Sequence, residues 1–218
     1  MFKRKRNIIC RNIDKFTSGE NRHLLIAGPS ASGKTTLANK ISKKYHIEVI
    51  HLDNIQTAFL DGIDAFRHLE QISSFNVHPL DSEFVSLYPE IPYGNIDVLE
   101  VWLYIDMYLK WLLSRRETLI IEYLFFRINR QYELYKDLSI IFMDLDPNLI
   151  YQQRVCRGIK IFYSALGRPD AFKQQLTWLI RDIKSRKHII EDMRYFNGVT
   201  TTLAEMGGEQ YVKTINDI

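Results

Sequence analysis

The stretch Leu24–Ser42, LLIAGPSASGKTTLANKIS, decides the fold of this 218-residue chain. Within it a glycine, four residues and Gly-Lys-Thr follow an apolar run and precede residues of helical period, so the loop joins a strand to a helix. Gly28 and Gly33 let successive backbone N–H groups turn inward, and the helix that begins near Lys34 adds the positive end of its dipole. The pattern predicts a phosphate-binding loop, or P-loop. The alternative is an ordinary strand-to-helix turn.

A loop of this kind binds a nucleotide and a metal ion through defined groups. We expect Lys34 to reach the β- and γ-phosphates and the Thr35 hydroxyl to bind Mg²⁺, so ATP and Mg²⁺ are the predicted cofactors. The residues predicted to bind the nucleotide are Gly28, Pro29, Ser30, Ala31, Ser32, Gly33, Lys34, Thr35 and Thr36.

Along the whole chain, short apolar runs alternate with longer segments of helical period, which is typical of a parallel sheet with crossover helices. The predicted strands are His23–Ala27, Glu48–Leu52, Thr118–Glu122 and Ser139–Leu145. The predicted helices are Lys34–Tyr45, Gly62–Ser74, Val98–Ser114, Pro147–Arg157 and Asp170–Ile190, and the prolines within Asn76–Asp97 predict a loop. The predicted fold class is α/β: a three-layer P-loop NTPase fold with a central parallel sheet, flanking helices and a mobile lid.

Composition limits the partners of the chain. The formal net charge is +3, but Lys3–Arg6 supply four of the 29 basic residues, which leaves 25 against 26 acidic ones. A near-neutral body gives no broad electrostatic surface for nucleic acid, so such binding must depend on the basic N-terminal arm or on a local groove. Two cysteines outside any Cys/His cluster predict reduced thiols and no zinc. No apolar run approaches the ~20 residues of a membrane span, so we expect a cytosolic protein.

Two carboxylates stand at the ends of predicted strands, where ligands of open α/β sheets bind. Asp53 follows the second strand, and Glu122 closes the third. Phosphoryl transfer needs a group that orients or deprotonates the attacking hydroxyl and a ligand for the metal, and we assign these roles to Asp53 and Glu122 respectively. The alternatives are a helix cap for Asp53 and a surface acid for Glu122.

A basic segment, YQQRVCRGIKIFYSALGRPD, covers residues 151–170. Arg154 and Arg157 are three residues apart and share a helix face, and Arg168 follows in Gly-Arg-Pro. Cations on a segment that closes over the nucleotide would neutralise charge on the transferred group and exclude water, so we interpret residues 154–170 as a lid. A solvated basic helix end is the alternative.

Together these motifs, with HLDNIQ and TLIIE between them, resemble the uridine kinase branch of the P-loop nucleoside and metabolite kinases over about residues 24–190. The resemblance implies a sheet with the P-loop strand in its centre. It implies catalytic roles for Lys34, Asp53, Glu122, Arg154, Arg157 and Arg168, with Thr35 and Glu122 as metal ligands. We therefore divide the chain into a basic arm, 1–20, and a kinase domain, 21–218, whose acceptor-side segment is about 54–113.

The chain also departs from this branch. Tyr123 replaces the glycine that usually follows the strand-end Glu, Gly158 replaces the Asp after the second lid Arg, and about four extra residues within Ile161–Leu166 lengthen the lid. Val77 stands where an Asp is expected in the acceptor-side segment. Phosphoryl transfer tolerates these changes more easily than uridine specificity does.

The acceptor pocket is expected between Asp53 and the aromatic stretch 75–111, with Tyr88 and Tyr93 as candidates to stack a base and Trp102 as a core residue. His51 and His78 are not spaced as metal ligands. Three functions stay open. The first is an ATP-dependent kinase acting on a hydroxyl of a nucleoside-like or other small molecule. The others are a kinase acting on a nucleic acid and a nucleotide-binding regulator or NTPase without an acceptor. The sequence leaves a homo-oligomer open.

Overall fold

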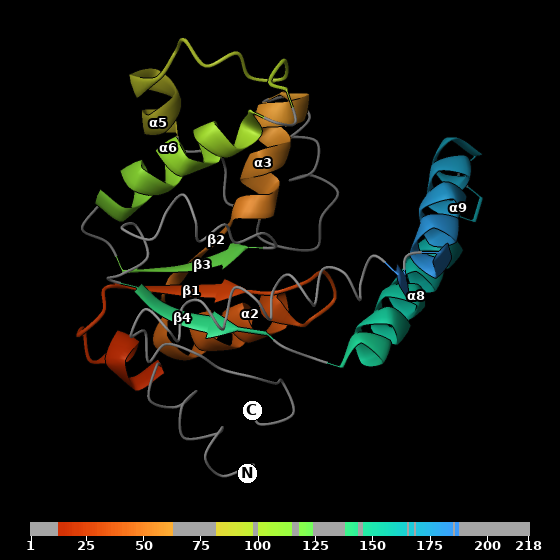
Figure 1. Cartoon of the computed structure of the whole chain (residues 1–218), viewed down its shortest axis with the longest axis horizontal. Coiled ribbons are helices and arrows are strands. Elements are labelled where there is room, and N and C mark those ends of the chain that lie inside the picture. Colours follow the sequence, from red (N-terminus) through yellow and green to blue (C-terminus); the bar gives the residue numbers. More distant parts are fainter. Residues whose placement is uncertain are drawn as a thin grey trace.

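A computed structural model describes residues 13–62, 82–97, 100–114, 118–123, 138–143, 146–164, 166–167, 169–184 and 186–187. Its centre is a parallel sheet with the strand order β2-β3-β1-β4. The strands are β1 (His23–Ala27), β2 (Glu48–His51), β3 (Leu119–Tyr123) and β4 (Leu138–Phe142). The α/β fold with its parallel sheet is thus confirmed, and β1, which leads into the P-loop, lies between β3 and β4 as expected (Figure 1).

Helices cover both faces of the sheet because side chains alternate along each strand. Leu24 and Ile26 of β1 pack into one core with α2 (Lys34–Tyr45) and with Phe16 of the helical residues 13–17. Leu25 and Ala27 pack into the larger core on the opposite face. That face carries α3 (Leu52–Asp61), α5 (Ser82–Leu87) and α6 (Val101–Ser114), which lie above the sheet in Figure 1.

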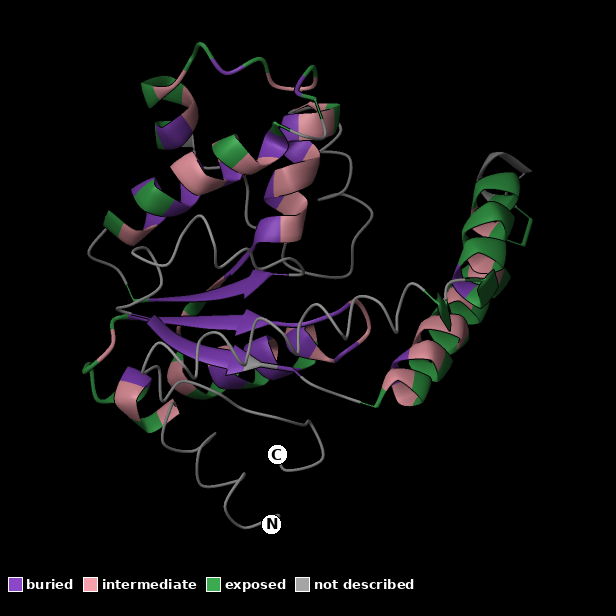
Figure 2. Cartoon of the chain, viewed as in Figure 1, coloured by how far each residue is buried: buried purple, intermediate pink, exposed green. Residues whose placement is uncertain are grey.

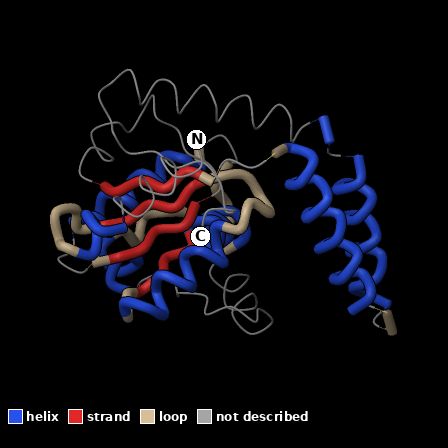
Figure 3. Tube along the Cα trace, turned by 90° about the horizontal axis from the view of Figure 1, so that it is seen from below, coloured by secondary structure: helices blue, strands red, loops and turns tan. Residues whose placement is uncertain are grey.

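The last two described helices form a hairpin beside these layers. These helices are α8 (Pro147–Ser164) and α9 (Pro169–Lys184). They run antiparallel, since Phe162 near the end of α8 meets Phe172 near the start of α9, and Tyr151 near the start of α8 donates to the carbonyl of Ile183. Figure 2 shows the hairpin largely exposed, and Figure 3 shows its two helices side by side next to the layered body. No helix in the described ranges is long and apolar enough to cross a membrane.

Several predicted boundaries were wrong. Residues 82–87 form helix α5 rather than loop; six residues without Pro or Gly are too few to show a periodicity in the sequence. Strand β2 ends at His51, so Leu52 already begins α3. Helix α8 does not end near Arg157 but continues to Ser164. The helix predicted at 62–74 lies outside the described residues from 63 onwards, as does the basic stretch 1–12.

The continuation of α8 has a packing reason. A Cβ on Gly158 would lie 3.2 Å from Cδ1 of Leu179 and 3.4 Å from Oδ2 of Asp182, both on α9. The glycine therefore permits a close helix crossing at this point, where the sequence favoured a helix end. The four extra residues noted within 161–166 fall mainly on the last turn of α8, so they lengthen a helix.

Candidate functional site

The P-loop begins at Gly28, which packs closely against Met143, the residue after β4. Gly28 has φ 151°, and a Cβ there would lie 2.8 Å from both Cβ and the carbonyl oxygen of Met143. The Met143 N–H donates to the carbonyl of Ala27 at 2.7 Å, which extends the β1–β4 pairing to the edge of the loop. Any side chain at position 28 would therefore displace the loop from the sheet.

Beyond Gly28 the loop turns into α2 through two left-handed residues. Gly33 is the N-cap of α2 with φ 86°, and Ala31 has φ 67°, a conformation that costs a non-glycine residue of order 1–3 kcal/mol. Between them the hydroxyl of Ser32 is buried and has no hydrogen-bond partner in the described structure. A strained loop that holds an unpaired buried hydroxyl next to a helix N-terminus fits an anionic ligand such as a phosphate.

Lys34 is buried at the start of α2, with 5% of its surface exposed. Its Nζ donates to the carbonyl of Pro29 at 3.1 Å and lies 3.6 Å from Oε1 of Glu122. Burial lowers the pKa of Lys34, and the charges of Glu122 and Asp53 act in the opposite direction. The Pro29 carbonyl and the Glu122 carboxylate thus hold the ammonium group in place, and the charge of Asp53 adds to its stabilisation.

Glu122 joins three elements at the carboxyl end of the sheet. It lies directly opposite His51 in the β2–β3 register, and its Oε2 lies 2.6 Å from Nδ1 of His51. Burial alone would raise the pKa of Glu122, but the hydrogen bond to His51 and the charge of Lys34 outweigh it and hold the pKa below its ordinary value of 4.5. We call Lys34, Glu122 and His51 the charged cluster.

The remaining predicted residues of the body lie around this cluster. Asp53 occupies the first turn of α3, is half-buried, and is close enough to Lys34 to affect its pKa. The N-cap of α3 is His51, so Asp53 does not occupy the capping position considered as its alternative role. Thr35 is half-buried and Thr36 is exposed, both in the first turn of α2.

The predicted lid arginines have different partners. Nη2 of Arg157 donates to the Ser30 hydroxyl of the P-loop at 3.1 Å, and this contact joins α8 to the loop. Nε of Arg154 donates to Oδ1 of Asp182 on α9 at 2.9 Å. Arg168 lies outside the described residues. The structure therefore brings Arg157 to the loop and turns Arg154 toward the inside of the hairpin.

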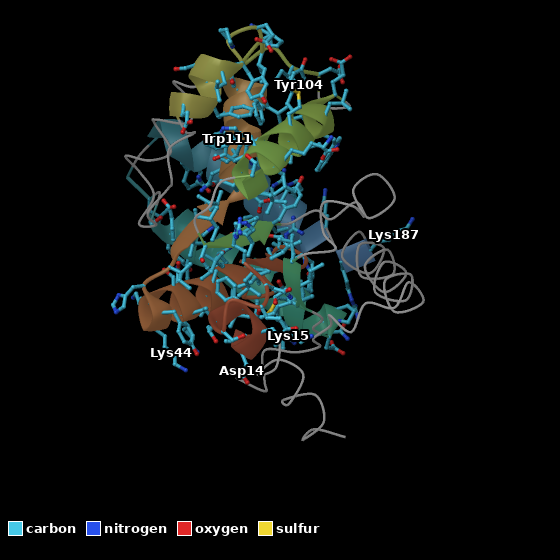
Figure 4. The ribbon with its side chains drawn as sticks, turned by 90° about the vertical axis from the view of Figure 1, so that its left-hand side faces the viewer. Asp14, Lys15, Lys44, Tyr104, Trp111 and Lys187 are labelled. Carbon is cyan, nitrogen blue, oxygen red and sulfur yellow. The ribbon has the colours of Figure 1, made fainter. Side chains whose placement is uncertain are left out.

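In the segment predicted to face the acceptor, the aromatic side chains pack against one another. Tyr93 stacks on Phe59 with ring centroids 5.6 Å apart, and Tyr88 lies 4.7 Å from Phe84. Tyr104 and Trp111, on α6, belong to the same layer (Figure 4). The two residues predicted to stack a base are thus half-buried members of the core edge.

Two residues beside this layer have further consequences. Trp102 packs against the core, which agrees with its predicted core role. Its ring centroid lies 6.3 Å from the ring centroid of the buried Tyr123. Tyr123 therefore fills the space under α6. The hydroxyl of Tyr93 is buried, and burial together with the nearby Glu90 raises its pKa to about 12.

Sequence reasoning missed three contacts in this region. They are His51 with Glu122, Ser30 with Arg157, and Asp182 with Arg154. His51 could have been found, because it is the last residue but one of a predicted strand and Glu122 ends another, and the carboxyl ends of neighbouring parallel strands meet. Asp182 lies 28 residues from Arg154, and no local pattern joins them.

Comparisons with known proteins give distant likenesses. No family model matches the chain. The tRNA dimethylallyltransferase of Onion yellows phytoplasma (strain OY-M) is 39% identical over 59 residues, which are 27% of this chain and 20% of that enzyme. The chain therefore aligns with about a fifth of the length of this curated relative.

Among solved structures, the shikimate kinase from Bacteroides thetaiotaomicron is 14% identical, with a TM-score of 0.36 over 77% of this chain and 79% of that one. The shikimate kinase from Acinetobacter baumannii, in complex with shikimate, is 16% identical, with a TM-score of 0.36 over 81% of this chain and 83% of that one. These likenesses are too distant to assign an activity, and the fold assignment rests on the strand order and loop described above.

Proposed function

We propose that this chain is an ATP-dependent phosphotransferase that moves the γ-phosphate to a hydroxyl group of a nucleoside-like or other small molecule. The observation that carries the proposal is the charged cluster: Lys34, under the P-loop, shares Glu122 with His51 at the carboxyl ends of β2 and β3. A phosphate loop alone fits many nucleotide-binding proteins. A buried acid paired with the loop lysine, with Asp53 near that lysine, also fits phosphoryl transfer.

The donor groups fit ATP and Mg²⁺. The unpaired Ser32 hydroxyl and the N-terminus of α2 suit phosphate oxygens. Mg²⁺ prefers oxygen ligands and binds through one or two carboxylates together with substrate phosphates, for which the Thr35 hydroxyl and Glu122 are the candidates. In the described part of the chain no group of three or more His, Cys, Asp and Glu residues could hold a metal by itself. Bound Mg²⁺ would supply neutralisation of phosphate charge.

For the chemical step we assign Asp53 as the base. An acceptor hydroxyl beside Asp53 attacks the γ-phosphorus as its proton passes to the Asp53 carboxylate, and the bond from this phosphorus to the β-phosphate oxygen breaks to release ADP. Lys34 exchanges its contact with Pro29 for the phosphates, while His51 keeps Glu122 paired. Arg157, already at the loop, is placed to neutralise charge that develops on the transferred group.

The test is transfer of labelled γ-phosphate from ATP to a panel of hydroxyl-bearing nucleosides, sugars and hydroxy acids, with Mg²⁺ present. We expect a labelled product with some member of the panel, and no product with Lys34→Ala. ATP hydrolysis that no acceptor stimulates would contradict the kinase proposal and favour an NTPase or regulator. The panel also tests the uridine kinase resemblance, which the comparisons do not support.

A second candidate is transfer to a nucleic acid, and one observation favours it. The relative that is 39% identical over 59 residues is by its name a tRNA-modifying enzyme. We therefore include RNA and DNA oligonucleotides as acceptors in the same assay. Labelled oligonucleotide in the absence of any labelled small molecule would favour this candidate over the first.

A further inference from the structure

Charge is distributed very unevenly along the chain. Residues 147–187, which contain the α8–α9 hairpin, hold nine lysines and arginines against two acids, Asp170 and Asp182. Residues 1–11 hold five basic residues, so the rest of the chain has 15 basic residues against 24 acidic ones. The near-neutral total therefore conceals a basic hairpin attached to an acidic body. Such a local concentration of cations attracts polyanions.

The basic residues of α9 lie on the face that points away from α8. Contacts with α8 define the inner face of α9: Phe172 meets Phe162, Leu179 lies at Gly158, and Asp182 binds Arg154. Lys173, Arg181 and Lys184 are all exposed, and positions 173, 177, 180 and 184 follow helical spacing along the opposite face. Between Lys173 and Lys184 this face is about 16 Å long at 1.5 Å per residue.

Between Lys173 and Lys184 no carboxylate interrupts this face. Asp182 is the one acid in that stretch, and it is turned toward Arg154, whereas Asp170, the other acid of α9, precedes Lys173 by three residues. Trp178 lies three residues before Arg181, at the edge of this face next to that arginine, and 42% of its surface is exposed. Cations that follow a backbone, with an exposed aromatic ring among them, are the combination that proteins use to bind single-stranded nucleic acids, because the ring stacks on a base.

We infer that the outer face of α9, with Lys173, Arg181, Lys184 and Trp178, is a binding surface for single-stranded nucleic acid. The three cations bind phosphates, and Trp178 stacks on a base. An acidic protein would use the cations but would not need the exposed indole. The surface does not depend on the proposed phosphoryl transfer, because none of its residues belongs to the P-loop or the charged cluster. The hairpin that carries this face also contacts the P-loop, through Arg157 of α8.

The experiment measures binding of the full-length chain to a labelled 20-nucleotide single strand by fluorescence anisotropy, without ATP, between 50 and 200 mM salt. RNA and DNA of one sequence, and the matching duplex, form separate arms. The triple variant Lys173→Gln, Arg181→Gln, Lys184→Gln should bind about 100-fold more weakly at 0.1 M salt, with a salt slope lower by about two, since each single-strand phosphate contact contributes about 0.7.

Two controls make the result specific. Lys40→Gln, Lys43→Gln, Lys44→Gln removes the same charge from exposed positions on α2 and should change binding little; in Figure 4 Lys44 lies well away from Lys187, which follows α9. Trp178→Ala should weaken single-strand binding about tenfold or more, and Trp178→Phe should restore most of it. Melting temperatures confirm that each variant is folded.

Three outcomes would overturn the inference. The first is an absence of salt-dependent binding to either single strand. The second is an equal loss in the α2 triple variant, which would reduce the effect to net charge. The third is equal binding of poly-glutamate together with no effect of Trp178→Ala, which would mark a surface for acidic proteins. In each case the kinase assay with small-molecule acceptors is unaffected, so the two proposals can fail separately.

Discussion

The charged cluster and the α8–α9 hairpin differ in how far their side chains are buried and in what they contact. Lys34, Glu122 and His51 are each at most 7% exposed; the β2–β3 register holds His51 opposite Glu122, and Lys34, at the start of α2, contacts Pro29 and Glu122. In the hairpin, Tyr163 is 65% exposed and Ile183 48%, and the contacts described above are mainly between its own two helices. The predicted phosphate-binding region is thus buried and held by several contacts, whereas the hairpin touches the loop through Arg157.

Under the proposed function, this difference predicts separate tasks for the two regions. Preorganised charge in a site that excludes water contributes to catalysis because it does not reorganise during the reaction. We propose that the exposed hairpin acts as the lid predicted from the sequence. We therefore expect substitutions in the cluster to affect chemistry most, and substitutions in the hairpin to separate into chemical effects at Arg157 and structural effects at Arg154.

The largest effect is expected at Lys34. Lys34→Ala removes the phosphate cation and should lower phosphoryl transfer by about 10³-fold or more, with a small change in melting temperature because its burial already opposes its charge. Lys40→Ala, an exposed lysine on the same helix, is the matched control. Label transfer and thermal unfolding are measured on both. Retained transfer in Lys34→Ala would exclude the P-loop assignment.

The next largest effect is expected at Asp53, where a substitution distinguishes a catalytic base from a structural residue. Asp53→Asn should lower transfer ~10²–10⁴-fold while ATP affinity and melting temperature stay near those of the unmodified chain. Asp61→Asn, an exposed acid at the end of the same helix, controls for lost charge. A variant that is destabilised but fully active per folded molecule would refute the base assignment.

The two arginines test the hairpin directly. Arg157→Ala should lower kcat about 10²-fold with little effect on ATP affinity, because it removes a cation at the loop. Arg154→Ala should instead cost about 1 kcal/mol in the free energy of unfolding, since it removes the ion pair between Arg154 and Asp182. Equal kinetic losses at unchanged stability would show that Arg154 also reaches the transferred group.

The last prediction concerns His51, where we expect an effect on stability and its pH dependence and not on the chemical step. His51→Leu should cost about 1–3 kcal/mol in the free energy of unfolding at pH 7 by leaving the Glu122 oxygen without its donor, and His51→Asn should restore part of it. Because the folded pKa of Glu122 lies below 4.5, its contribution is present above this pH and is lost as pH falls through the folded pKa. Denaturant titrations between pH 7 and pH 3 measure this, and a difference that does not shrink on acidification would contradict the pairing.

The sequence by itself determined the elements whose signals are local. The P-loop, strand β1 and helix α2 are where the pattern predicted them, because Gly28 and Gly33, an apolar run and a helical period lie within about twenty residues. The placement of Glu122 near a strand end was predicted in the same way. Helix α5 was missed because it is short, and the length of α8 was missed because Gly158 favours a helix end unless another helix packs closely on it.

Tertiary structure alone decided which groups meet. The β2–β3 register places His51 opposite Glu122, which is 71 residues away, and makes a histidine with no sequence motif part of the charged cluster. Arg154 and Arg157 are equivalent in the sequence, yet the crossing of α8 and α9 directs one to Asp182 and the other to Ser30. The physical reason is that helix and strand periods specify which face a side chain occupies, whereas packing and register specify what lies opposite that face.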